Sequence, residues 1–86
     1  MFSYKNTIIQ NDMKEMINIP ISWDRLDGKY CLVTGANGMI ATYLIYLLIS
    51  LVREKGLDIH IIALSRNRKK SEELFVDFLD DSHFEL

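Results

Sequence analysis

The chain has 86 residues, enough for one small domain, and 49% of them are hydrophobic. Its formal net charge of −2 gives no electrostatic basis for binding nucleic acid, and its single cysteine, Cys31, excludes an internal disulfide. Because residues 1–6 also lack the basic and apolar segments of a signal peptide, we expect a cytoplasmic protein with no nucleic-acid partner.

Residues 1–28 are expected to form an N-terminal extension that contains a short amphipathic helix. Apolar side chains recur there at helical spacing, in Ile9, Met13, Met16 and Ile17. Asn6 or Thr7 can cap a helix that begins near residue 8, and Pro20 disfavours its continuation beyond about residue 18. Trp23 is expected to pack this extension against the rest of the chain.

A β-type run at residues 30–33 leads through two glycines into a long apolar segment. Gly35, Gly38 and Ala41 give the spacing G-x-x-G-x-x-A, which shares its last two small positions with the dinucleotide fingerprint G-x-G-x-x-G/A. A strand that turns into a helix N-terminus directs unpaired N–H groups and the positive end of the helix dipole at one point. We therefore expect a dinucleotide pyrophosphate to bind the backbone N–H groups of Gly35, Asn37, Gly38, Met39 and Ile40.

The pair Asn37 and Gly38 is also a strong hairpin signal, but a hairpin requires an alternating strand next, and residues 39–52 do not alternate. Only Thr42 and Ser50 are polar in that segment, so the helix expected from about residue 38 to residue 53 should be buried on all sides. It is shorter than the ~20 residues that span a bilayer, and it lacks a basic polar face. We expect no membrane association.

Residues 59–64 form a nearly continuous apolar run, which predicts a strand covered on both faces. Because a helix joins it to the first strand, the two strands should be parallel, with a right-handed crossover. Ser71 is predicted as the N-cap of a further helix, with Leu74, Phe75, Phe78 and Leu79 on its buried face. Residues 83–86 are expected to approach a third strand without forming it. The predicted fold class is α/β, in βαβα order.

From about Leu26 onward, the chain resembles the extended short-chain dehydrogenase/reductase family, specifically its NAD(P)-dependent sugar-nucleotide epimerases and dehydratases. That family opens with a strand, T-G-x-x-G-x-x-G, a helix, a second strand and a polar cluster. The corresponding segments here are residues 32–41, residues 59–64, and the cluster Ser65, Arg66 and Asn67. The third small position holds Ala41, which the fingerprint tolerates. The resemblance implies that residues 29–86 are the first part of an NAD(P)-binding Rossmann domain, a partial doubly wound domain.

The resemblance places Ser65, Arg66 and Asn67 beside the adenosine ribose. NAD-binding members of the family usually carry an acid at the end of the second strand, where this chain has Ser65 followed by Arg66. The loss of a carboxylate and the gain of a guanidinium favour the 2′-phosphate of NADP. The alternative is that Arg66 is a solvated member of a basic run that continues through Arg68, Lys69 and Lys70.

Catalytic residues are not expected in this chain. The family's Tyr-x-x-x-Lys is missing, because none of Tyr4, Tyr30, Tyr43 and Tyr46 is followed four places on by a lysine. Cys31, His60 and His83 show no metal-ligand spacing, so no metal site is expected. The sequence thus predicts a dinucleotide-binding N-terminal fragment of such an enzyme. The alternative is a non-catalytic α/β interaction module that oligomerises through its apolar helix. Both hypotheses predict self-association.

Overall fold

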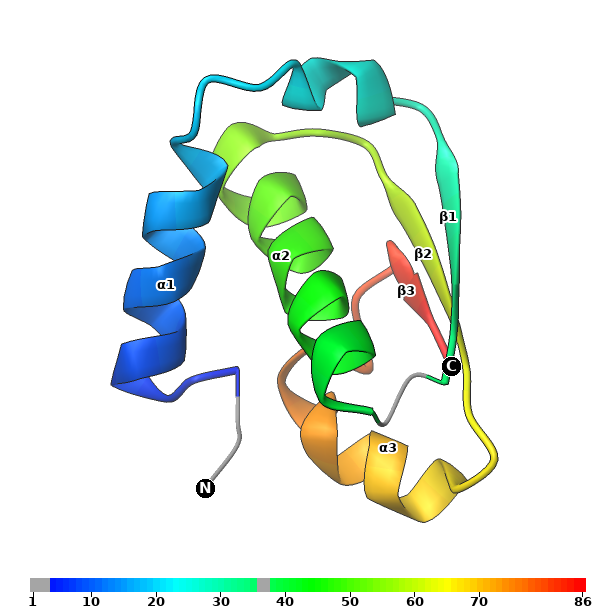
Figure 1. Ribbon diagram of the computed structural model, residues 1–86. Coiled ribbons are helices and arrows are strands. Elements are labelled where there is room, and N and C mark those ends of the chain that lie inside the picture. The colour runs from blue at the N-terminus through cyan, green and yellow to red at the C-terminus, as the bar shows by residue number, and fades with distance from the viewer. Residues whose placement is uncertain (1–3, 36–37) are drawn as a thin grey trace.

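The computed structural model describes residues 4–35 and 38–86, which form an α/β unit with three helices beside a small parallel sheet (Figure 1). In chain order the elements are α1 (Thr7–Ile17), the short 3-10 helix η1 (Trp23–Leu26), β1 (Tyr30–Thr34), α2 (Met39–Lys55), β2 (His60–Leu64), α3 (Arg68–Leu74), the 3-10 helix η2 (Val76–Phe78) and β3 (Phe84–Glu85).

The strands lie in the order β1-β2-β3 and are parallel, which confirms the predicted pairing of the first two. The register runs from Tyr30 opposite His60 to Thr34 opposite Leu64. β3 differs from the sequence-based expectation, because it does form and pairs with β2. A turn leads into it, in which the Phe84 N–H donates to Asp81 O at 3.0 Å.

All three helices lie on one side of the sheet (Figure 1). The second strand is therefore not covered on both faces as predicted. Val33, Ile61 and Ala63 face the helices and are buried, whereas Tyr30, Leu32 and Leu64 are 73%, 63% and 50% exposed. The reason is topological. The connections from β1 to β2 and from β2 to β3 run across the sheet in the same direction, and connections of the same handedness then place their helices on the same face. We call the other side, which carries Tyr30, Leu32 and Leu64, the open face.

α2 is the central element of the core. Ile45, Tyr46, Ile49 and Leu51 are fully buried, because the sheet lies against one side of α2 and α1 lies beside another (Figure 1). The prediction that this helix is buried on all sides is correct for residues 45–51 and wrong for its first turns, where Met39, Ile40 and Leu44 are exposed.

The N-terminal helix and Trp23 are as the sequence predicts. Asn6 caps α1 through its side-chain oxygen, which accepts from the Ile8 N–H at 2.9 Å. Ile9, Met13 and Ile17 enter the same core as α2, and Trp23 packs against that core.

The third helix begins earlier than predicted. Asn67, rather than Ser71, is its N-cap, and the Asn67 side-chain oxygen accepts from the Lys70 N–H at 3.1 Å. Ser71 lies inside α3 and is completely buried. Asparagine and serine both favour N-cap positions. Which of the two caps α3 depends on where the helix begins after β2, because only a residue at that point can reach the free N–H groups of the first turn.

Candidate functional site

A hollow of about 520 Å³ lies at the carboxyl ends of β1 and β2, lined by Thr34, Gly35, Leu64, Ser65 and Arg66. Thr34 and Leu64 are register partners, so the residues that follow the two strands meet at the same edge of the sheet. The volume is within the range usual for small-molecule sites, and ligands in open α/β sheets bind at this edge. The structure thus brings together the predicted site residues Gly35, Ser65 and Arg66.

The turn between β1 and α2 favours glycine on both sides. Gly35 has φ of +64°, a left-handed conformation that side chains with a Cβ rarely adopt. A Cβ on Gly38 would lie 3.3 Å from Gly35 O, closer than most such contacts, while the Gly38 N–H donates to that same oxygen at 2.9 Å. The turn is closed tightly by its own backbone. Asn37, also predicted here, lies outside the described residues.

The N-terminus of α2 follows directly from this turn. Gly38 is the N-cap and has no side chain to accept from the first N–H groups, and the first turn of α2 carries no acidic residue. These groups and the helix dipole therefore favour an anion. The backbones of Met39 and Ile40 belong to this turn, but their side chains line a separate apolar hollow of about 510 Å³, together with Met16, Tyr43, Leu44 and Leu47.

The hydroxyl of Ser65 is held by protein partners. Its Oγ accepts from the Asn67 N–H at 3.1 Å and lies 2.6 Å from Ser71 Oγ and 3.2 Å from Asn67 O. Ser71 was not predicted as a site residue, and its serine-to-serine contact has no sequence signal. Ser65 therefore contributes a fixed turn to the hollow, with its hydroxyl directed toward α3.

Arg66 is the cation available to a ligand in the hollow. Its side chain is exposed, and within residues 4–35 and 38–86 its guanidinium makes no hydrogen bond or ion pair. Arg68, by contrast, lies 3.4 Å from Glu72 Oε2 and donates to Leu86 O at 3.3 Å. Asn67, predicted to face the ribose, uses its side-chain oxygen to cap α3.

Cys31 lies in β1 and is half-buried, and burial raises the pKa of its thiol. This favours the protonated, unreactive form. Among the described residues, no group of three or more histidine, cysteine, aspartate or glutamate side chains is placed to hold a metal ion. Nor does any helix in that part of the chain have the length and apolar character needed to cross a membrane.

Comparisons of this chain with protein-family models, with curated proteins and with solved structures gave no match.

Proposed function

We propose that the chain is a dinucleotide-binding unit of the kind that opens NAD(P)-dependent sugar-nucleotide epimerases and dehydratases, and that it favours NADP. The observation that carries this proposal is the hollow in which the glycine turn after β1 meets Ser65 and Arg66 after β2. The parallel order β1-β2-β3, with the hollow at the carboxyl ends of the strands, is consistent with the first half of a Rossmann-type domain and supports the proposal.

The described residues fit a dinucleotide in two respects. A Cβ at Gly38 would make a tight contact with Gly35 O, and the α2 N-terminus offers backbone N–H groups to a pyrophosphate. The Arg66 guanidinium can pair with a 2′-phosphate, which NAD lacks. Because the Ser65 hydroxyl is already bonded to Asn67 and Ser71, we assign it to holding the turn around Arg66 rather than to contacting the ribose.

A bound nicotinamide would supply hydride transfer, and this chain would supply binding and orientation. Without a Tyr-x-x-x-Lys, none of its residues can be assigned the proton transfer of that family. Epimerase or dehydratase activity is therefore proposed only for an enzyme that also contains the Tyr-x-x-x-Lys motif.

Arg66→Ala tests the cofactor preference. We expect it to weaken NADP binding about tenfold, the factor that corresponds to a charge-assisted hydrogen bond at the lower end of its range, and to leave NAD binding nearly unchanged. Calorimetric titration of both cofactors measures this. Arg25→Ala is the matched control, because Arg25 is an exposed arginine on η1, which precedes the amino end of β1, whereas the hollow lies at the carboxyl ends of β1 and β2.

Gly38→Val separates binding at the turn from the preference for NADP. It should weaken both cofactors, because the new side chain would meet Gly35 O and obstruct the pyrophosphate. If Arg66→Ala weakens NAD and NADP equally, the NADP assignment is wrong. If neither cofactor binds the wild-type chain, it is not a dinucleotide-binding unit by itself.

The second candidate function, a self-associating interaction module, is favoured by the open face. Tyr30, Leu32 and Leu64 form an exposed apolar surface on the sheet, in addition to the exposed residues at the start of the helix that the sequence suggests as an interface. β1 is also an edge strand without charged residues or proline, a type of edge that promotes pairing with another chain.

Sedimentation at high micromolar concentration should show self-association of the wild-type chain, and Leu32→Lys should reduce it by placing a charge in the middle of β1. Val76→Lys is the matched control, because Val76 is 61% exposed but lies on η2, away from the open face. A wild-type chain that stays monomeric, or a Val76→Lys variant that dissociates as readily as Leu32→Lys, would contradict this second candidate.

A further inference from the structure

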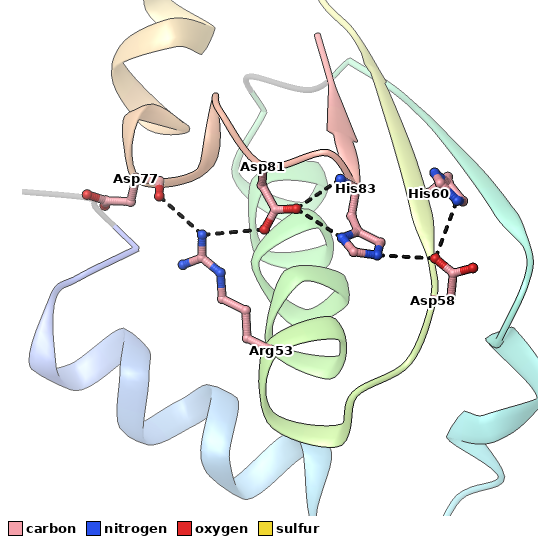
Figure 2. A network of polar contacts seen from close by, with 6 residues as sticks. All are labelled: Arg53, Asp58, His60, Asp77, Asp81 and His83. Carbon is pink, nitrogen blue, oxygen red and sulfur yellow. Dashed lines mark hydrogen bonds and ion pairs between the residues drawn. The ribbon is translucent and has the colours of Figure 1, made fainter.

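A chain of polar contacts joins the amino ends of β2 and β3, far from the glycine turn (Figure 2). At its centre, the His83 ring lies between two carboxyl groups. Its Nδ1 is 3.0 Å from Asp81 Oδ1, and its Nε2 is 3.1 Å from Asp58 Oδ1. Both distances are those of hydrogen bonds.

Only a protonated ring satisfies both contacts. An ionised carboxylate accepts hydrogen bonds and donates none, and a neutral imidazole has a single N–H, so one of the two contacts would set a nitrogen lone pair against an oxygen. The imidazolium form donates from both nitrogens, and each hydrogen bond is then charge-assisted. The arrangement therefore selects the charged form of His83.

The other charged groups around His83 belong to the same network. Arg53 Nη2, from the last turn of α2, lies 3.6 Å from Asp81 Oδ2 and donates to Asp77 O at 3.2 Å. His60 Nε2 lies 3.4 Å from Asp58 Oδ1, and the His60 and His83 ring centroids are 5.6 Å apart. His60 thus competes for the same Asp58 oxygen, at a longer distance and through one nitrogen.

Asp81 keeps its charge as the pH falls. Burial raises the pKa of its carboxyl, but the hydrogen bonds from the His83 N–H and ring, with the charges of His83 and Arg53, outweigh burial and leave that pKa below its usual value. Asp81 therefore stays ionised throughout the range in which histidine changes charge, between about pH 5 and about pH 8.

His83, which the two carboxylates hold, also connects β3 to the sheet through its backbone carbonyl. The Ile61 N–H donates to His83 O at 2.7 Å, and β3 has only Phe84 and Glu85 in register with β2. Asp58 in turn is held by the turn before β1, since its N–H donates to Asp27 Oδ1 at 2.7 Å. A hydrogen bond between His83 and Asp58 therefore connects β3, which is very short, to a residue that the turn before β1 already holds.

We propose that His83 is a proton-dependent latch, in which its doubly bonded imidazolium holds β3 against β2 and loss of the ring proton releases that edge of the sheet.

Hydrogen exchange at the Ile61 amide tests the latch directly, because that N–H donates to His83 O. After correction for the intrinsic pH dependence of exchange, wild-type protection should fall about tenfold as the pH rises and the ring loses its proton, the factor that corresponds to one hydrogen bond to a charged group. His83→Gln should remove this pH dependence. His60→Gln is the matched control and should keep it, because His60 makes only the longer contact.

The ring itself provides a second readout that does not depend on the variants folding. Nitrogen NMR of wild-type His83 should show both ring nitrogens protonated where the Ile61 amide is protected, with one ring proton lost as the Ile61 amide loses protection. Protection that does not change with pH, or a pH dependence that disappears in His60→Gln and persists in His83→Gln, would overturn the proposal.

Discussion

Replacing Phe78 with alanine should destabilise the protein by about 3–5 kcal/mol, the usual cost of removing a large buried aromatic side chain and leaving a cavity. Phe78 is 1% exposed and lies at the centre of an aromatic cluster that joins four segments of the chain. Its ring centroid is 4.9 Å from that of Phe84, 5.4 Å from Tyr4, 5.6 Å from Phe75 and 6.1 Å from Tyr46.

The loss should be enough to unfold much of the population. A domain of this size buries a modest share of its surface, and folded proteins are stable by only about 5–15 kcal/mol, with small ones near the lower limit. Urea denaturation followed by circular dichroism measures the change. Val76→Ala in the same 3-10 helix is the control, because Val76 is exposed and its truncation should cost less than about 0.5 kcal/mol. A loss of under about 1 kcal/mol for Phe78→Ala would show that the cluster is not part of the core.

Alkaline pH should destabilise the protein through Tyr46. Burial, with a smaller contribution from the charge of Asp77, raises the pKa of the Tyr46 phenol from 10.0 to about 12. The folded state keeps the phenol proton that the unfolded chain releases at lower pH. The contribution of Tyr46 is therefore complete below about pH 10 and is lost as the pH rises toward 12, by about 2–3 kcal/mol for this shift.

Tyr46→Phe separates this effect from the hydrogen bond that the phenol makes. At neutral pH the variant should lose about 1 kcal/mol, because the Tyr46 hydroxyl no longer donates to Leu74 O at 2.8 Å. Between about pH 10 and pH 12, it should lose less additional stability than the wild type, so the two curves approach each other or cross. Denaturation curves across this range provide the measurement. Parallel curves would mean that the phenol ionises equally easily in the folded and unfolded states.

Local sequence signals were sufficient for the elements that depend on neighbouring residues. A glycine turn between a β-type run and an apolar run predicted a strand followed by a helix. The next apolar run then had to be a parallel strand, because a helical connection of this length is the crossover that joins parallel strands. The N-cap at Asn6 and the spacing of Ile9, Met13 and Ile17 specified α1. The preference for glycine at positions 35 and 38 is equally local, since it depends on backbone conformation and on a contact three residues away.

What the sequence could not determine were contacts between segments far apart in the chain. An apolar run is the same whether one or both faces of a strand are covered, so only the placement of both crossovers on one side revealed the open face. The same holds for the start of α3 at Asn67, for Ser71 against Ser65, and for the position of His83 between Asp58 and Asp81. Each of these residues has several possible hydrogen-bond partners in the sequence, and the three-dimensional arrangement selects one of them. The reason is that hydrogen bonding depends on distance and direction rather than on sequence separation.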